Sequence, residues 1–511
     1  MAFSPWLVFF TNHSNESRLS YRRNVGIKLK ENLILLSRLN AIFATMKLTC
    51  WGAAGTVTGS MHLLELPNGK NILIDCGLNY ENKNELVENN LHFPFPPKKI
   101  HAVILTHAHV DHCGNLPNLV RQGFEGPIFC TAATKELTYH LLEDSLSIQI
   151  MDSQKKQMTR KGKKVVKKPS KPLLYQYKHL HQTMALVREV EFHIPVSLFS
   201  DTQFTFYHAG HILGAASVFM ETVEGNTKKT IGFTGDLGNY KSKLVRDPEP
   251  MPSPDFLVSE STYGGRYHSA DNDPKDVLLH HIQKTCVGLS GKLIIPAFSV
   301  GRTQAIIFTL HQLYAEGKLP PIKIYSDSPL AIKTTGLYSQ YINLLDQETQ
   351  DFYKQYGEIF NFPNLHSLAN KAHSEYISTD YEPCVIISAA GMVEGGRIQE
   401  HVKNNISNAF STILIAGFCA EGTFGHQLLQ GRQTVFINHK ERRVMASIQK
   451  TDAFSAHPDH LGLLNYLKLT CGSITKKIFL VHADPFSSAA LKQGIDFAPV
   501  EIASKGFTYE L

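Results

Sequence analysis

The sequence predicts an α/β fold in which short buried strands alternate with helices. Short apolar runs are bounded by glycines or charges, as in "HAVILT" (101–106), and such runs are typical of strands buried on both faces. From residue 263 to about residue 450, most of these runs lead into a glycine- or serine-rich turn and then into a helical pattern. Strands and helices that alternate in this way favour a parallel sheet.

Size and composition are those of a globular chain. The protein has 511 residues, of which 43% are apolar and 19% charged, so it is long enough for about two or three domains. No run of about 20 apolar residues occurs, so we expect no membrane span and no membrane partner. The eight cysteines have no paired spacing, which favours free thiols in a reducing compartment and predicts a cytoplasmic location.

Turn signals and apolar runs give the expected order of elements. In the first half, strands are expected at 47–53, 60–66, 71–77, 101–106, 127–131, 203–210, 217–223, 229–236 and 256–261. Helical spacing is expected over 133–151 and 175–190. In the second half, apolar strands are expected in "KLIIPAFSVGR", "IKIYSDSPLA", "CVIISAAGMVEGGR" and "TILIAGFCAEGTFG", and finally in "KKIFLVHAD" (476–484).

The net charge of +6 comes from two local segments. Residues 1–45 are basic, and residues 153–172 hold nine basic side chains and no acidic one. The second segment could contact phosphate, or it could be a solvated insertion, and the sequence leaves both open. Strand-like alternation begins at Met46, so we interpret 1–45 as an N-terminal extension that is not part of the fold.

The stretch "THAHVDHCG" (106–114) concentrates metal-binding side chains after a buried strand. His107 and His109 are two residues apart, so in an extended chain they share a face. Asp111 and His112 follow after a turn and can face a second centre. Imidazole suits zinc, and a carboxylate can bridge two ions or fix one.

Other strands also end in potential ligands. His211 comes just after 203–210, Asp236 after 229–235, Glu260 at the end of 256–260, and His482 after 477–481. Functional side chains of α/β folds gather where strands end, because rigid strands there pass side chains to loops. Together with the histidine cluster, His211 and Asp236 are predicted to be a third histidine ligand and a bridging carboxylate.

Nine motifs, in order, resemble those of the metallo-β-lactamase-fold nucleases of the beta-CASP group. They are "THAHVDHCGNLP", "HAGHILGAAS", "FTGDLG", "ESTYGGRYH", "PAFSVGRTQ", "DSPLA", "GMVEGGR", "FSAHPDH" and "FLVHAD". The resemblance covers roughly residues 46–505. It is greatest to the RNA-processing branch that includes the endonuclease of mRNA 3′-end cleavage and its bacterial and archaeal relatives.

This resemblance implies an architecture. It implies a metallo-β-lactamase αββα sandwich formed by residues 46–262 and 451–511. An inserted α/β beta-CASP domain, a parallel sheet flanked by helices, would occupy residues 263–450.

The resemblance also implies the roles of site residues. His107, His109 and His211 would hold one zinc ion; Asp111, His112 and His482 would hold a second; Asp236 would bridge the two. Asp111 is expected to act in catalysis as well, and Glu260 and His457 would form an acid–base pair at the domain junction. "FLVHAD" departs from the commoner "VHGE" ending at Ala483 and Asp484, which leaves open what supports the ring of His482.

The expected activity is zinc-dependent hydrolysis of phosphodiester bonds in single-stranded RNA. Two zinc ions about 3.5–4 Å apart can hold a hydroxide, and His457, positioned by Glu260, could protonate the leaving oxygen. The inserted domain would cap the metal cleft, which favours a thin, single-stranded substrate. Phosphate contacts are expected at turns that follow strands, from Ser299, Arg302, Gly395, Gly396 and Arg397.

Three alternative functions differ in what the site would do. A DNA nuclease of the same group tends to lack the histidine found at His482. A small-molecule metallo-hydrolase would not need the long insertion or "FSAH". A non-catalytic RNA-binding subunit would have lost ligands, whereas all seven positions are filled. The sequence does not decide between endonuclease and exonuclease action, and it leaves a homodimer open.

Overall fold

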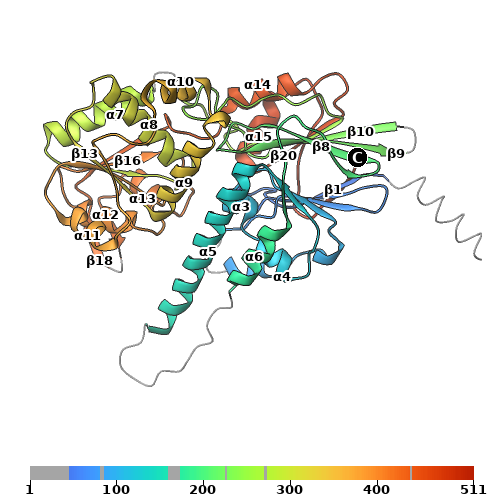
Figure 1. Cartoon of the computed structure of the whole chain (residues 1–511), viewed down its shortest axis with the longest axis horizontal. Coiled ribbons are helices and arrows are strands. Elements are labelled where there is room, and N and C mark those ends of the chain that lie inside the picture. The colour runs from blue at the N-terminus through green and yellow to red at the C-terminus, as the bar shows by residue number, and fades with distance from the viewer. Residues whose placement is uncertain (1–44, 81–85, 159–172, 225–226, 270–272, 438–439) are drawn as a thin grey trace, which may run out of the picture.

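The computed structural model describes residues 45–80, 86–158, 173–224, 227–269, 273–437 and 440–511. The predicted extension 1–45 and most of the basic segment 153–172 therefore lie outside the described residues. Figure 1 shows two lobes side by side, one with two facing sheets and the other with a third sheet. No helix among the described residues is both long enough and apolar enough to cross a membrane.

The first sheet contains the first six strands of the chain and the last one, in the order β22-β1-β2-β3-β4-β5-β6. Its strands are β1 (Lys47–Gly52), β2 (Met61–Glu65), β3 (Asn71–Ile74), β4 (Ala102–Ile104), β5 (Ile128–Cys130), β6 (Val187–Glu189) and β22 (Thr508–Glu510). β1, β2 and β3 are antiparallel neighbours, and β3 to β6 are parallel. All three side chains of β4 are buried, as the continuous apolar run predicts.

The second sheet also has seven strands, in the order β21-β20-β11-β10-β9-β8-β7. They are β7 (Val196–Phe199), β8 (Thr202–His208), β9 (Ala216–Glu224), β10 (Thr227–Phe233), β11 (Phe256–Glu260), β20 (Lys477–Val481) and β21 (Val500–Ile502). Its inner face packs on the first sheet through a shared apolar core that includes Leu48, Ile104, Phe206 and Phe479. Because β20 pairs with β11, the last part of the chain completes this sheet.

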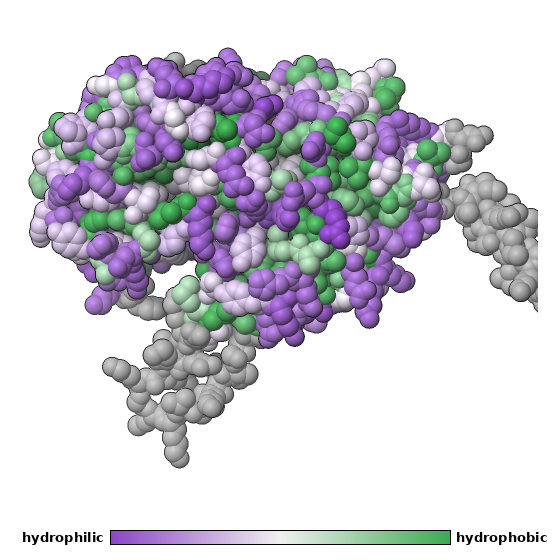
Figure 2. Space-filling model, in the orientation of Figure 1, coloured by the Kyte–Doolittle hydropathy of each residue, from purple (hydrophilic) through white to green (hydrophobic). Residues whose placement is uncertain are grey.

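Helices cover the outer faces of both sheets. α4 (Leu116–Arg121), α5 (Ala132–Met158) and α6 (Tyr177–Leu186) lie on the first sheet, and α14 (His460–Thr470) and α15 (Pro485–Gly494) on the second. The expected αββα sandwich is confirmed. Most of the face shown in Figure 2 is hydrophilic, as expected when amphipathic helices turn their apolar sides inward. α5 is long and extends past the body of the molecule in Figure 1.

The third sheet consists of six parallel strands in the order β14-β13-β15-β12-β16-β19. They are β12 (Lys292–Pro296), β13 (Lys323–Asp327), β14 (Leu365–Ser367), β15 (Cys384–Ser388), β16 (Thr412–Ala416) and β19 (Ser447–Thr451). Every side chain of β12 is buried, since helices pack on both faces.

Two groups of helices cover the two faces of this sheet. α7 (Pro274–Ile282), α8 (Arg302–Ala315), α9 (Pro329–Gln340) and α10 (Gln347–Tyr356) share one core with it, and α11 (Lys371–Thr379), α12 (Ile398–Asn405) and α13 (Phe424–Leu429) lie on the other face. The parallel sheet flanked by helices is thus confirmed, while the boundaries at 262 and 450 stay a prediction.

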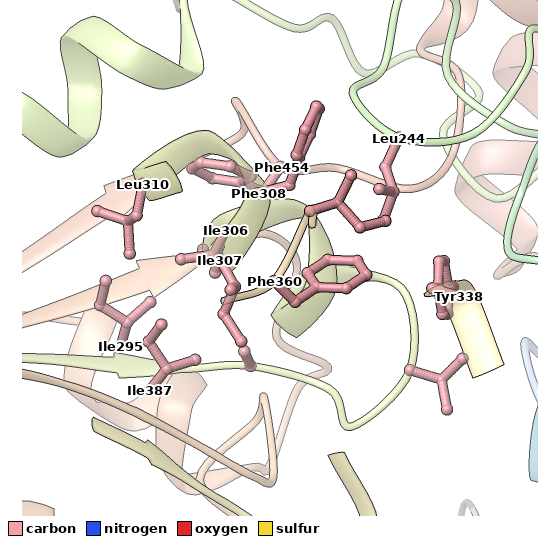
Figure 3. Packing of buried hydrophobic residues seen from close by; sticks show 14 of the residues in the cluster. Leu244, Ile295, Ile306, Ile307, Phe308, Leu310, Tyr338, Phe360, Ile387 and Phe454 are labelled. Carbon is pink, nitrogen blue, oxygen red and sulfur yellow. The ribbon is translucent and has the colours of Figure 1, made fainter. Parts of the chain in front are cut away.

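An apolar core runs without interruption from one lobe into the other. Figure 3 shows part of it, where Leu244 and Phe454 approach Phe308, Tyr338 and Phe360. Polar contacts reinforce the junction: the Leu244 N–H donates to the Asp346 carboxylate, and the Asp346 N–H donates to the Leu244 carbonyl. The two lobes are therefore joined by buried apolar contacts as well as by hydrogen bonds.

The structure corrects one predicted element and adds others. The helix expected over 175–190 ends at Leu186, and Val187–Glu189 form β6 instead. β6 exists because it pairs with β5, and this tertiary contact overrides local helical spacing. The hairpin of β17 (Thr434–Ile437) and β18 (Lys440–Arg443) was not predicted either. β17 reads TVFI and carries a strand signal that the prediction overlooked, whereas β18 reads KERR and has no apolar residue.

Candidate metal centre and acid–base pair

Four strand ends meet where the two sheets of the sandwich face each other. His107 follows β4, His211 follows β8, Asp236 follows β10 and His482 follows β20. His109 lies just before the short helix α3 (Val110–Cys113), which carries the remaining two predicted ligands. The seven side chains form two groups, within each of which the ligand atoms lie within 4.8 Å of one another. The groups are His107, His109, His211 and Asp236, and Asp111, His112 and His482.

The ring nitrogens of the first group are spaced as the ligands of one metal ion would be. The Nδ1 atom of His109 lies 3.1 Å from Nε2 of His107 and 3.1 Å from Nε2 of His211. Two nitrogens bound to one tetrahedral zinc at about 2.0–2.1 Å would be roughly 3.3–3.4 Å apart. Asp236 Oδ2 lies 3.6 Å from Nε2 of both His107 and His211.

The second group adjoins the other oxygen of Asp236. His112 Nε2 lies 3.2 Å from His482 Nε2 and 3.2 Å from Asp236 Oδ1. Asp111 Oδ2 is 3.5 Å from His482 Nε2. Asp236 therefore directs one oxygen to each group. Its Oδ1 is buried and accepts no hydrogen bond from the described residues, which fits a carboxylate that would bind a cation.

The electrostatics of the cluster also suit cations. Burial lowers the pKa values of His107 and His211 well below the ordinary range and that of His109 to about 4. These rings are therefore neutral at pH 7, the form in which imidazole binds a metal. Burial alone would also lower the pKa of His112, but the carboxylates of Asp236 and Asp75 outweigh it and raise that pKa well above the ordinary value. The second group thus lies in a negative field that favours a cation.

Asp75 is a site residue that sequence reasoning missed. Its carboxylate accepts hydrogen bonds from His112 Nδ1 at 2.7 Å, from the Thr106 N–H at 2.8 Å and from the Thr106 hydroxyl at 2.8 Å. Such a contact fixes the tautomer and the orientation of a metal-binding imidazole. Asp75 comes directly after the apolar strand β3, so the strand-end signal that identified Asp236 could have identified it.

Threonines support two other rings of the cluster. The Thr106 hydroxyl lies 3.1 Å from His107 Nδ1, and the Thr262 hydroxyl lies 3.1 Å from His482 Nδ1. The ring of His482 is therefore supported by Thr262. Asp484 instead caps α15 and pairs with Arg266 at 2.8 Å, so the departure from "VHGE" does not leave His482 without support.

Glu260 and His457 are in contact beside the metal cluster. His457 Nδ1 lies 3.1 and 3.2 Å from the two carboxylate oxygens of Glu260, and the ring centroids of His457 and His211 are 4.6 Å apart. Glu260 is fully buried, whereas the His457 side chain is 20% exposed to solvent. Burial alone would lower the pKa of His457, but the charge and hydrogen bond of Glu260 outweigh it and raise that pKa to about 9. This pair can therefore hold a transferable proton at neutral pH.

The predicted phosphate contacts lie around the carboxyl edge of the third sheet. Ser299 follows β12, with its hydroxyl 3.3 Å from that of Ser328, and Arg302 begins α8. Gly395 and Gly396 have φ values of 119° and 68°. A Cβ on Gly396 would lie 2.4 Å from the carbonyl oxygen of Ala389, so this turn requires glycine.

Arg397 is already paired within the fold. Its guanidinium donates to Asp327 at 2.6 Å and to the carbonyls of Leu368 and Ala369 at 2.8 and 2.7 Å. Asp327 is fully buried, and His401 binds its other oxygen at 2.6 Å. Arg397 therefore holds its loop against β13, and its contact with substrate phosphate stays a prediction.

Three family models match the chain. They are the metallo-beta-lactamase superfamily over residues 54–188, the Beta-Casp domain over residues 303–428, and a Zn-dependent metallo-hydrolase RNA specificity domain over residues 441–503. Together they match more than half of the chain, on both lobes.

Curated relatives match along most of the chain. Ribonuclease TTHA0252 of Thermus thermophilus is 32% identical over 447 residues, which are 87% of this chain and 95% of the relative. The transcription termination factor FttA of Methanosarcina mazei is 28% identical over 91% of this chain and 70% of its own length. Cleavage and polyadenylation specificity factor 73 of Drosophila melanogaster is 28% identical over 86% of this chain and 60% of its own length.

Proposed function

The chain belongs to the beta-CASP RNA nucleases of the metallo-β-lactamase superfamily, and on this premise we propose that it hydrolyses single-stranded RNA with two bound zinc ions. It is a hydrolase of the nuclease type. The observation that carries the finer proposal is the convergence of seven imidazole and carboxylate groups, with one oxygen of Asp236 directed to each half. Imidazole with carboxylate is a donor set that suits zinc.

The residues that would hold the ions divide as the two groups do. His107, His109 and His211 would hold one ion, Asp111, His112 and His482 the other, and Asp236 would contact both. When bound, such a pair of ions supplies a nucleophilic hydroxide at neutral pH and neutralises charge on the phosphoryl oxygens. The Asp111 side chain is 23% exposed, so this ligand is accessible to solvent.

His457 is proposed to protonate the leaving oxygen. Its Nδ1 is held by Glu260, which leaves Nε2 as the nitrogen that can donate toward the cleft. Glu260 is itself fixed by the N–H of Leu237, so the carboxylate can orient the imidazole and stabilise its positive charge. The leaving oxygen receives the proton, and His457 regains it from water before the next turnover.

A single strand fits the position of the site between the lobes. His457 lies on the loop that follows β19, and its ring stacks on that of Tyr263 with centroids 5.9 Å apart. His211 lines one cavity together with Arg302 and Phe454, so the metal cluster adjoins the start of α8, and a thin substrate is proposed to enter there. The match to an RNA specificity domain over residues 441–503 supports RNA as the substrate class.

The test compares the wild-type protein with His457→Ala on end-labelled RNA, with the zinc content measured by elemental analysis. We expect the wild type to cleave the RNA and to carry about two zinc ions, and His457→Ala to lose cleavage while retaining zinc. The exposed His373 provides the control, and His373→Ala should keep both properties. Full activity of His457→Ala would refute the proton-donor role.

The same assay decides between RNA and DNA. An oligodeoxynucleotide of the same sequence is digested in parallel under identical conditions. If the DNA is cleaved faster than the RNA, DNA rather than RNA is the substrate class. If the purified wild-type protein contains no zinc, the proposed zinc mechanism is ruled out.

A further inference from the structure

Arg302 is a buried cation without an acidic partner among the described residues. Its side chain is 9% exposed. Its Nε donates to the carbonyl of Phe454 at 3.3 Å, and its guanidinium lies 4.8 Å from the ring centroid of Phe298. Its terminal nitrogens, Nη1 and Nη2, have no acceptor in the part of the chain that the structure describes. These two nitrogens are not among the fully enclosed polar atoms of the described residues, so an anion from solution can reach them, and buried charges are normally paired.

The surroundings of the guanidinium point to the same conclusion. Burial lowers the pKa of Arg302, and the groups that oppose this effect are Tyr263 and Cys419 rather than a carboxylate. Arg397 shows the contrast, since it lies in the same domain and pairs directly with Asp327. One arginine is therefore neutralised within the fold, and the other is not.

The position of Arg302 is one where α/β folds bind ligands. It follows the loop after β12, and its guanidinium lies against the turns after the two neighbouring strands, β15 and β16. A Cβ on Gly417 would lie 2.6 Å from Nη2, and one on Gly391 would lie 3.3 Å from Nη1. Ligands of open parallel sheets bind in such crevices, outside the carboxyl ends of adjacent strands.

Arg302 also begins a 14-residue helix. α8 has Gly301 as its N-cap residue and no side-chain cap, so its first N–H groups and its dipole add to the positive potential. Arg302 shares the wall of one cavity with His211, a member of the metal cluster. Tyr263, which interacts with Arg302, stacks on His457. The unpaired guanidinium is thus next to the proposed reaction centre.

We propose that Arg302 and the start of α8 bind one backbone phosphate of the RNA, adjacent to the phosphate that is cleaved. This inference rests on the proposed function, because it takes the RNA backbone as the ligand. A charge-assisted pair with a phosphate would supply the missing anion and would fix the register of the strand over the metal cluster.

The test measures binding of fluorescent single-stranded RNA to the zinc-loaded His457→Ala protein over a range of salt concentrations. Arg302→Met should weaken binding about tenfold to a hundredfold, as expected for a lost charge-assisted hydrogen bond. The slope of log K against log salt should fall in magnitude by about 0.7, the contribution of one phosphate of a single strand. Arg302→Lys keeps the charge and should keep the slope. Lys371→Met removes a cation that is 80% exposed on α11 and should leave both quantities unchanged.

A second measurement identifies the phosphate without relying on the variant alone. Single neutral methylphosphonates are placed at successive linkages of the RNA. In the protein that retains Arg302, a methylphosphonate at one linkage near the scissile bond should weaken RNA binding. In Arg302→Met, a methylphosphonate at the same linkage should weaken binding no further. Equal losses at every linkage in both proteins would overturn the proposal. So would an unchanged salt slope in a folded Arg302→Met protein. Failure of the wild type to cleave RNA would instead contradict the proposed function.

Discussion

Replacing Asp75 by asparagine tests how the metal cluster is held. The carboxylate receives three hydrogen bonds, from His112 Nδ1 at 2.7 Å and from the Thr106 N–H and hydroxyl at 2.8 Å each. An asparagine of the same size has one oxygen and one NH2 group, so at least one of these donors would face another donor. The His112 ring would lose its fixed orientation or the Thr106 contact would be lost.

The expected loss of zinc affinity follows from these hydrogen bonds. A hydrogen bond to a charged group contributes about 1.5–3 kcal/mol when buried, and about 1.4 kcal/mol corresponds to a factor of ten. We therefore expect zinc to bind about tenfold to a hundredfold more weakly in Asp75→Asn. Loss of a comparable partner of a metal-binding histidine has the same typical cost.

The assay is zinc competition against a chromophoric chelator, with kcat/KM on labelled RNA as a second readout. Asp255 gives a matched control, because its carboxylate accepts from the N–H and hydroxyl of Thr230 at 2.8 and 2.9 Å, next to the opposite end of β11 from Glu260. Asp255→Asn should lower the melting temperature and leave zinc affinity unchanged. Wild-type zinc affinity in a folded Asp75→Asn protein would refute the reasoning.

Three further predictions concern charge. Burial would raise the pKa of Asp327, but hydrogen bonds from His401 and other donors outweigh it and lower that pKa. The ionised carboxylate therefore stabilises the fold above the unfolded-state value of about 3.9, and this stabilisation is lost as the pH falls further. The melting-temperature gap between wild type and Asp327→Asn should narrow below about pH 4, and a constant gap would contradict this. Glu260→Gln removes the charge that raises the pKa of His457, so the alkaline limb of kcat/KM should move to lower pH; an unmoved limb would argue against the pair. Chelation of zinc should lower the melting temperature reversibly, because a ligand at about 1,000 times its Kd stabilises a protein by about 4 kcal/mol; equal melting temperatures with and without chelator would show that no ion is bound.

Potential ligands at the ends of buried strands can be identified from sequence, because the signal lies within a short local segment. A buried apolar run followed by histidine or aspartate marks a rigid support for a ligand, and this is visible within ten residues. By this rule the sequence predicted that His107, Asp236 and His482 would share a site, and the structure brings them together. The rule would have found Asp75 as well, had it been applied to the strand "NILI".

What the sequence determined by itself was the type of most elements, the side chains that gather at the candidate metal centre and the family to which its motifs belong. Tertiary structure alone decided which of two similar arginines is paired with a carboxylate. Arg397 pairs with Asp327, whereas Arg302 has no carboxylate partner among the described residues and contacts a carbonyl and an aromatic ring. It also decided that Val187–Glu189 form an edge strand. The physical reason is that charge pairing and strand pairing depend on neighbours distant in sequence, whose positions are set by the packing of whole sheets.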